Sequence, residues 1–366
     1  ISGLTLQSTI DLDLQKALYQ ALNKVIEQNN SSGGAVVALD PRNGEILAMV
    51  SEPSFNPKNF VKGLTPEQYT ETFDNPDHPF INRVITGEYP SGSTIKPVIA
   101  TAALEEHIVT PQTEFLSTGG IRINEWFFPD WQSGGHGLTN LNKAIAESVN
   151  TYFYTIAGGY EEFEGMGVNV MNKYTRAFGF SNKTGIDLNN EQEGFLPTKE
   201  WKQEYKNERW YIGDTYHYAI GQGDVLVTPL QIANATAVIA NGGTLYKPRL
   251  VKNWLSSDGL VIDQVSSEIL NDQVASPQNL GYVKNALREA VVSGSGRSLS
   301  TFQVPVAGKT GTAQVSGSDR YHSWFTAFAP YDSPEIVITA IVEQGGEGHA
   351  TALPVVKSGL TQYFSD

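Results

Sequence analysis

Residues 304–315 read VPVAGKTGTAQV and open a series of three β-like runs near the C-terminus. The other two runs are HSWFTAFA at 322–329 and EIVITAIVE at 335–343. Turn residues separate the runs, and β-branched or aromatic residues are frequent within them, which is typical of strands. The end of the chain is therefore predicted to supply three consecutive strands of one sheet.

A hairpin and a helix are predicted at the other end of the chain. The apolar runs GAVVALD (34–40) and EILAMV (45–50) are joined by a turn ending in Asn-Gly, which indicates a β-hairpin. Before them, apolar residues recur at helical spacing over 12–28, with Asp11 as the predicted N-cap. A closing helix is expected over about 352–364.

The long middle of the chain has a helical pattern. Residues 51–90 are rich in Pro, Asn and Asp and are expected to be irregular. A helix is predicted from Ser93 to about Glu106, and the chain beyond it is predicted to be mostly helical to about residue 245, with Gly and Pro loops. The clearest helices in this part are 141–145, 152–157 and 229–240.

One architecture accounts for this order of strands, helices and strands. We expect an α and β fold in a single domain, 1–366, with a central antiparallel sheet built from both ends of the chain and flanked by helices. Residues 1–92 and 245–366 would form the sheet subdomain. A mainly helical subdomain, 93–244, would be inserted between them and would carry the helix that begins at Ser93 and the loop with Ser148-Val149-Asn150.

Composition restricts the classes of partner and site. The 366 residues carry a formal net charge of −14, so nucleic acid is not an expected partner. The chain has no cysteine, which excludes disulfides and thiolate metal sites. It has no run of 18 apolar residues and begins with Ile1, so we expect it to be cut from a longer precursor with any signal or anchor upstream.

The only Ser-x-x-Lys of the chain spans Ser93 to Lys96. Residues three apart lie on one helical face, so Lys96 would sit one turn from the Ser93 hydroxyl. A serine needs a base to become a nucleophile, and a buried lysine with a pKa lowered toward roughly 7–8 can be that base. The Pro/Gly turn 88–92 would place Ser93 at the positive end of the helix. The alternative is a surface Ser and Lys.

Two further short motifs each have a second copy. Ser148-Val149-Asn150 offers a hydroxyl for proton relay and an amide for a substrate peptide, but Ser54-Phe55-Asn56 matches equally well. Lys309-Thr310-Gly311-Thr312 is matched in part by Lys183-Thr184-Gly185, which is expected to be a structural loop. The copy at 309 lies in a strand-like run whose glycines leave one face open, so it could pair with an extended peptide.

The three motifs occur in the order Ser93, Ser148 and Lys309. They would supply a nucleophile, a hydroxyl from the helical part and a lysine from a strand. Penicillin-binding proteins and β-lactamases have this set of motifs. The chain resembles a class B penicillin-binding protein from about Leu6 to Phe364, and most of all penicillin-binding protein 2 of the elongation type. The family often has a second proline where this chain has Ser91. Supporting stretches are Ser51–Pro57, Asn82–Arg83, Gly135–Gly137, Leu196–Lys202, Gly213–Thr215, Gly221–Gly223, Thr228–Gln231 and Trp324–Pro330.

The resemblance implies a β-lactamase/transpeptidase-like fold and a serine acyl-enzyme. Ser93 would attack the penultimate D-Ala carbonyl of a pentapeptide stem while Lys96 takes its proton. The backbone N–H groups of Ser93 and Thr312 would form the oxyanion hole. Ser148, near Lys96 and Lys309, would pass a proton to the departing D-Ala.

The same resemblance implies how substrates are held. Asn150 would hold the donor amide, and the hydroxyls of Thr310 and Thr312, on either side of Gly311, would hold the terminal carboxylate. An amine of a neighbouring stem would then resolve the acyl-enzyme, which β-lactams would trap by mimicking D-Ala-D-Ala. No metal or organic cofactor is implied.

The implied setting is cell-wall biogenesis and cell shape. The partners would be stem peptides ending in D-Ala-D-Ala, β-lactam antibiotics and a membrane glycan polymerase. The enzyme would lie on the extracytoplasmic face of the bacterial cytoplasmic membrane, in the periplasm, anchored by an N-terminal segment.

Other interpretations stay open. A D,D-carboxypeptidase or a β-lactamase would use the same nucleophile, although the chain lacks the Glu-x-x-Leu-Asn of class A lactamases. A β-lactam sensor or an idle binding domain is the alternative from another class. A Ser-His-Asp enzyme is disfavoured, because no histidine lies in a nucleophile-elbow context. Asp130 and His136 could contribute to a metal site, but a polar loop is favoured.

Overall fold

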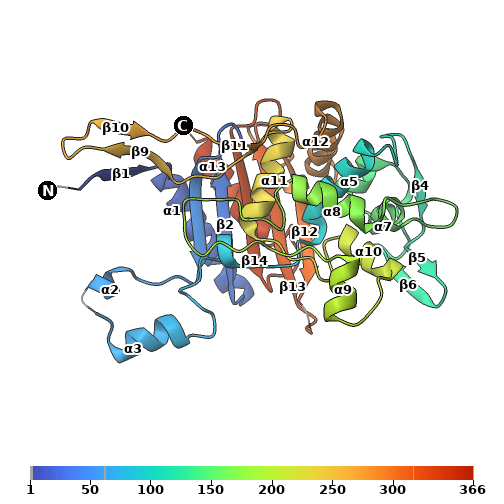
Figure 1. Ribbon diagram of the computed structural model, residues 1–366, viewed down its shortest axis with the longest axis horizontal. Coiled ribbons are helices and arrows are strands. Elements are labelled where there is room, and N and C mark those ends of the chain that lie inside the picture. The colour runs from blue at the N-terminus through green and yellow to red at the C-terminus, as the bar shows by residue number, and fades with distance from the viewer. Residues whose placement is uncertain (1–2, 62, 316, 366) are drawn as a thin grey trace.

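A five-stranded antiparallel sheet forms the centre of the molecule (Figure 1). The computed structural model describes residues 3–61, 63–315 and 317–365. Strands from the two ends of the chain are adjacent in the sheet, which confirms the predicted fold class. In spatial order the strands are β12 (Ala307–Gln314), β13 (Tyr321–Ala329), β14 (Ile336–Glu343), β2 (Gly33–Leu39) and β3 (Ile46–Glu52).

The contact between β14 and β2 joins the two ends of the chain. Ile341 pairs with Ala35 and Val337 with Leu39, so about 300 residues lie between partners in one ladder. All seven residues of β2 are buried, because helices cover both faces of the sheet. A continuous apolar run rather than an alternating one is therefore the pattern that this strand requires.

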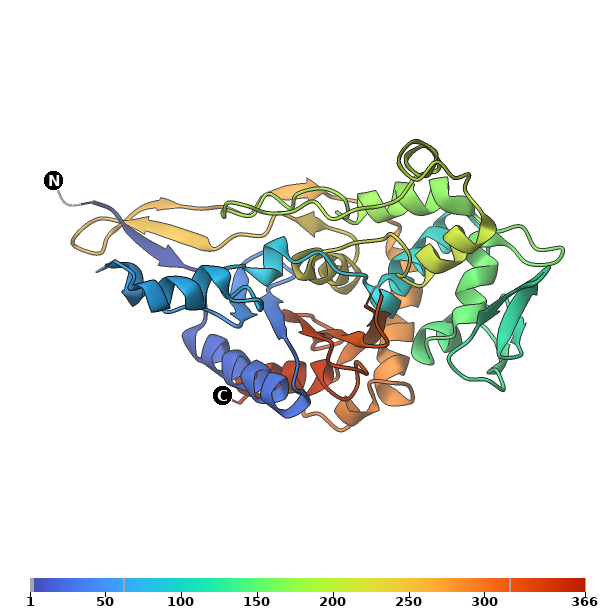
Figure 2. The ribbon, with the colours of Figure 1, turned by 90° about the horizontal axis from the view of Figure 1, so that it is seen from below.

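Helices from both ends of the chain cover one face of the sheet. α1 (Leu12–Asn29) packs beside α13 (Ala352–Tyr363), as Figure 2 shows at the bottom of the view. The side chain of Asp11 accepts hydrogen bonds from the first free N–H groups of α1, which confirms the predicted N-cap. α11 (Pro229–Asn241) lies against the other face of the sheet, on β14, β13 and β2.

The middle of the chain departs from the predicted helical pattern in one segment. Residues 115–139 form four short strands in two hairpin-like pairs, which lie at the right of Figure 1. Gly119, Gly120, Gly135 and Gly137 all have positive φ there, a conformation that does not continue a helix. The strands are β4 (Phe115–Ser117), β5 (Gly120–Ile123), β6 (Trp126–Pro129) and β7 (Gly137–Thr139).

Helices make up most of the remaining middle segment. The expected helix from Ser93 begins as a 3₁₀ turn, η2 (Gly92–Ile95), and becomes α-helical only in α5 (Lys96–Glu105). In the described part of the chain, no helix combines the length and apolar character needed to cross a membrane. The other helices of this segment are α6 (Leu141–Ala146), α7 (Asn150–Gly158), α8 (Gly167–Ala177), α9 (Lys199–Tyr205) and α10 (Ile212–Ala219). A further helix that was not predicted, α12 (Pro277–Val292), lies beyond it in the chain.

Several smaller elements were not predicted. β1 and β10 flank β9 in a three-stranded sheet near the N-terminus, and β8 pairs with β11. The segment expected to be irregular contains short helices. The bounds are β1 (Thr5–Ser8), α2 (Lys58–Val61), α3 (Pro66–Tyr69), η1 (Thr70–Asp74), α4 (Arg83–Thr86), β8 (Leu245–Tyr246), β9 (Val251–Leu255), β10 (Val261–Gln264), β11 (Ile269–Asn271) and η3 (Arg297–Leu299).

One hydrophobic cluster joins the sheet to the helices of the middle segment, and a second lies between the sheet and helices α1 and α13. The largest cluster of buried side chains includes Val37 of β2, Ile99 of α5 and Ile239 of α11. The predicted boundaries at residues 92 and 245 therefore do not separate two independent cores. Their use as subdomain limits stays a prediction.

A buried ion pair connects α4 to the end of β14. Arg83 is only 4% exposed, and its Nε donates to Oε1 of Glu343 at 2.9 Å. The Tyr89 hydroxyl donates to the same oxygen at 2.6 Å, and Ser32 Oγ donates to Oε2 at 3.0 Å. Both charges depend on these partners, because the side chains of Arg83 and Glu343 are only 5% and 14% exposed.

Removing Arg83 should therefore destabilise the protein. We expect Arg83→Ala to cost about 3–5 kcal/mol of unfolding free energy, because it leaves the Glu343 carboxylate buried without its cation. The matched control is Lys16→Ala, which breaks the exposed pair with Asp13 (3.3 Å) and should change stability by at most about 1 kcal/mol. Thermal and urea denaturation would measure both, and equal losses would contradict the assignment.

Candidate active site

The first motif forms a tight turn that presents Ser93 beside a buried lysine. Ser93 lies in the 3₁₀ turn η2, and Lys96 is the first residue of α5. Pro97 occupies the first turn of α5, where it costs no hydrogen bond. Ser93 is half-buried, whereas Lys96 is fully buried. The sequence thus places an accessible hydroxyl and a desolvated amine on one turn.

The Lys96 amine is hydrogen-bonded to the Ser148-Val149-Asn150 motif. Its Nζ lies 2.7 Å from the carbonyl oxygen of Ser148 and 2.7 Å from Oδ1 of Asn150. The Ser148 hydroxyl lies 3.3 Å from the same nitrogen. The structure therefore brings together the Ser-x-x-Lys turn and the Ser-x-Asn loop, which are separated by about 50 residues of chain.

The Ser148 loop holds an unusual backbone conformation. Ser148 connects α6 to α7 with a φ of 60°, in the left-handed region that serine rarely adopts. The next residue, Val149, is buried and offers no side-chain cap to α7. The carboxylate of Asp130 caps that helix instead, accepting from the backbone N–H of Asn150 and of Thr151 at 3.2 and 2.9 Å.

The third motif lies on β12, the edge strand of the sheet. Lys309 is fully buried, and its Nζ donates to the carbonyl oxygen of Thr310 at 3.1 Å. A Cβ added to Gly92 would lie 2.7 Å from the carbonyl oxygen of Thr312, and one added to Gly311 would lie 2.9 Å from the side chain of Thr94. Glycine at both positions therefore allows the serine turn and the strand to touch.

Comparison with known proteins identifies the family of this chain. The family model for the penicillin binding protein transpeptidase domain matches residues 34–360. This chain belongs to the penicillin-binding protein transpeptidase family. The resemblance predicted from the motifs is thereby confirmed.

Relatives and solved structures agree with this assignment. Peptidoglycan D,D-transpeptidase MrdA of Haemophilus influenzae is 35% identical over 391 residues, covering 100% of this chain and 57% of the relative. Pseudomonas aeruginosa PBP2, solved in complex with WCK 5153, matches at 35% identity with a TM-score of 0.88, covering 100% of this chain and 80% of that one. A peptidoglycan synthase complex that coordinates polymerization and crosslinking matches at 35% identity and a TM-score of 0.85, covering 99% and 63%. The chain thus spans little more than half the length of the MrdA relative.

Burial lowers the pKa values of the two lysines at this transpeptidase-family site. Burial lowers the pKa of Lys96 well below its ordinary value, the nearby Lys309 lowers it further, and Asp130 raises it. Burial lowers the pKa of Lys309 to about 7. The ring of Phe153, 5.2 Å from the Lys96 nitrogen, adds to the apolar surroundings. Burial therefore favours the neutral form of both amines.

The threonines of β12 already have partners. Thr310 and Ser295 share a hydrogen bond of 2.6 Å between their hydroxyl groups, and Thr312 donates to Oε2 of Glu347 at 3.0 Å. Sequence reasoning missed both partners. Ser295 lies in a Ser-Gly-Ser-Gly stretch that could have indicated a loop, whereas the exposed Glu347 gives no signal in the sequence.

The second copies of the short motifs have their own local contacts. The Thr184 backbone N–H and hydroxyl and the Gly185 N–H all donate to the carboxylate of Glu191. Ser54 donates to Glu52 at 2.9 Å. In both second copies, the side chains and N–H groups therefore bond to carboxylates a few residues away in the chain. This agrees with the structural role expected for residues 183–185.

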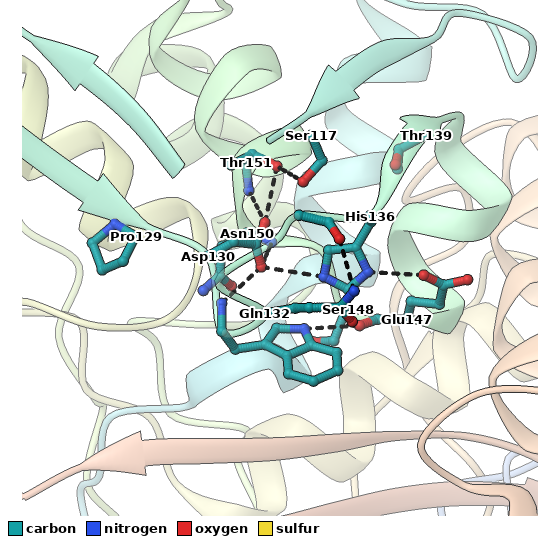
Figure 3. Close-up of polar contacts among 12 residues, drawn as sticks. Ser117, Pro129, Asp130, Gln132, His136, Thr139, Glu147, Ser148, Asn150 and Thr151 are labelled. Carbon is teal, nitrogen blue, oxygen red and sulfur yellow. Dashed lines mark hydrogen bonds and ion pairs between the residues drawn. The ribbon is translucent and has the colours of Figure 1, made fainter. Parts of the chain in front are cut away.

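Asp130 and His136, considered above as metal ligands, lie side by side in Figure 3. Nε2 of His136 is 3.6 Å from Asp130, and Nδ1 is 2.8 Å from Glu147. The two carboxylates thus approach opposite nitrogens of the ring instead of converging on one point. Among the residues that the structure describes, no group of three or more His, Cys, Asp or Glu could hold a metal ion.

The contact between the serine turn and β12 can be tested at Gly92. Gly92→Ala would strain a backbone with φ of 52° and push a methyl group against the Thr312 carbonyl. The control, Gly242→Ala, has a φ of 88° and no atom within 4 Å of the added carbon. We expect Gly92→Ala to lose about 1–3 kcal/mol more stability than the control in thermal denaturation. If the two variants lost equal stability, the cost at Gly92 would come from backbone strain alone, and a close contact with Thr312 would be contradicted.

Proposed function

We propose that this chain is the catalytic domain of a peptidoglycan D,D-transpeptidase that is acylated by penicillin. The observation that carries the proposal is the Lys96 amine, which is fully buried, one turn from Ser93 and hydrogen-bonded to Ser148 and Asn150. Burial without a neighbouring carboxylate in hydrogen-bond contact favours the neutral amine, and a neutral amine is a base.

The lysine geometry supports proton transfer from Ser93. A neutral Lys96 has two N–H donors and one lone pair. The two contacts of 2.7 Å, to the carbonyl oxygens of Ser148 and Asn150, can use both donors. The lone pair is then left for a hydroxyl proton, so Lys96 would accept the proton of Ser93 as Oγ attacks the penultimate D-Ala carbonyl.

The remaining groups would complete acylation. The N–H groups of Ser93 and Thr312 would stabilise the oxyanion, each worth about 2.7–4 kcal/mol. When the tetrahedral intermediate collapses, the C–N bond breaks, and the Ser148 hydroxyl would relay the proton from Lys96 to the leaving D-Ala. The side-chain NH₂ of Asn150 stays available for a substrate carbonyl, because its oxygen faces Lys96.

An acceptor amine would resolve the acyl-enzyme. It would attack the ester carbonyl, release Ser93 with its proton, and leave a new amide crosslink. The terminal carboxylate of the donor would bind the hydroxyls of Thr310 and Thr312, with Gly311 between them. Since Thr312 donates to Glu347 in this structure, a substrate carboxylate would have to displace that contact.

The proposed setting follows from the substrate and from the relatives. Stem peptides ending in D-Ala-D-Ala belong to peptidoglycan, so the domain would act on the extracytoplasmic side of the bacterial cytoplasmic membrane. The similarity to a synthase complex that coordinates polymerization and crosslinking supports a glycan polymerase as partner. The proposed mechanism assigns no step to a metal or an organic cofactor.

Fluorescent penicillin tests the nucleophile. Ser93→Ala should abolish labelling, because the residue that forms the acyl bond is gone, while Ser54→Ala in the second Ser-x-Asn copy should label normally. Intact-protein mass spectrometry and peptide mapping of the adduct would provide the readout. An adduct on another residue, or labelling that survives in Ser93→Ala, would refute the assignment. Rapid turnover of nitrocefin would favour a β-lactamase instead.

The rate of penicillin acylation should follow a bell-shaped pH profile. Lys96 must be neutral to act as a base, so the rate should fall on the acid side as Lys96 gains a proton. Lys309 favours the penicillin carboxylate only while charged, so the rate should fall above about pH 7 as Lys309 loses its proton. Stopped-flow acylation between about pH 5 and pH 10 would measure this. A rate still rising at the alkaline end would contradict the lowered pKa of Lys96.

A further inference from the structure

Asp130 is a buried carboxylate that lies directly behind the Ser148 loop (Figure 3). Its side chain is fully buried, and the residue directly follows the last residue of β6. Within the described ranges, its one ion-pair partner is the His136 ring, whose Nε2 lies 3.6 Å away. A buried carboxylate without a close cation requires hydrogen bonds to remain charged.

Those hydrogen bonds come mainly from the start of α7. The backbone N–H groups of Asn150 and Thr151 and the hydroxyl of Thr151 donate to Asp130, at 3.2, 2.9 and 2.9 Å. The N–H of Trp131 donates at 2.9 Å. The first N–H groups of a helix have no partner within the helix, and a carboxylate there is also favoured by the helix dipole. Asp130 thus caps the nine-residue helix α7 from a position 20 residues before it in the chain.

The other end of the Ser148 loop is also held from this segment. The indole N–H of Trp131 donates to the backbone carbonyl of Glu147 at 3.0 Å, and His136 Nδ1 lies 2.8 Å from the Glu147 carboxylate. Ser148 therefore sits between two residues whose positions depend on residues 130–136. This arrangement can keep its left-handed backbone in place against the conformational preference of serine.

We propose that Asp130 is a positioning residue of the transpeptidase site, which holds Ser148 and Asn150 against Lys96 through the first turn of α7. The inference rests on the proposed function. It assigns to Asp130 no contact with the substrate and no metal. Its effect on catalysis is transmitted by the backbone of Asn150 and by its charge.

The charge of Asp130 gives the proposal a distinctive signature. The groups that act on the protonation of Lys96 are Lys309 from β12 and Asp130 from the segment after β6. The neutral dipoles of Ser148 and Asn150 contact it from the loop. Removing the negative charge would lower the pKa of Lys96 further, because only Asp130 among these charges favours the ammonium form.

The test is Asp130→Asn in the whole chain, compared with Glu191→Gln. Glu191 is a matched control: it is 7% exposed and accepts from loop N–H groups at 2.8 and 3.1 Å, outside the catalytic set. For Asp130→Asn we expect penicillin acylation about 10- to 100-fold slower at its optimum, and an acid limb of the pH profile moved to lower pH. Glu191→Gln should lose thermal stability and keep the wild-type profile.

The outcomes separate the inference from the proposed function. If wild type is labelled on Ser93 and Asp130→Asn keeps its rate and acid limb, the inference is wrong and the function stands. A loss of thermal stability without a moved limb would reduce Asp130 to a structural role and also overturn the inference. If wild type itself is not labelled, the proposed function fails first.

A second variant covers the case in which Asp130→Asn does not fold. Thr151→Val removes the hydroxyl donor to Asp130 and preserves shape, whereas Thr151→Ser keeps the donor. We expect acylation to slow about three- to tenfold in Thr151→Val and to recover in Thr151→Ser, since a lost hydrogen bond displaces the capping carboxylate. Equal rates in wild type and Thr151→Val would then count as refutation.

Discussion

The desolvated amine of Lys96 is the constraint around which the site is arranged. A lysine removed from water must lose its charge or gain acceptors, and Lys96 finds its acceptors on the Ser148 loop. That loop keeps its shape because the start of α7 and residue Glu147 are held by the segment from 130 to 136. The position of one nitrogen atom thus depends on elements far apart in sequence.

A close approach between the backbones of the serine turn and β12 is the second constraint on the site. The serine turn and β12 touch where Gly92 and Gly311 have no side chains, and a Cβ added to Gly221 would clash with the carbonyl oxygen of Gly92. This leaves β12 at the open edge of the sheet with Thr310 and Thr312 beside Ser93's turn. Interiors are packed too densely for a side chain to be added at such crossings without displacing one of the two backbones.

Much of this could be predicted because the signals are local. The apolar run of β2, the Asn-Gly turn after it and the cap at Asp11 each depend on a few neighbouring residues, and all three were predicted correctly. The four strands within 115–139 were missed because short strands in glycine-rich sequence have no strong period. The capping role of Asp130 and the contact of Glu347 with Thr312 arise from tertiary packing, which no spacing in the sequence reports.

The pairing of β14 with β2 also has a consequence for how the protein forms. A ribosome releases residues 33–39 roughly 300 positions before residues 336–343, so the hairpin of β2 and β3 has one unpaired edge until β14 has been synthesised. Contacts between such distant partners close large loops and slow the search for the native state. During that interval the exposed apolar strand is vulnerable to aggregation, and chaperones that shield nascent chains would act on this end of the molecule.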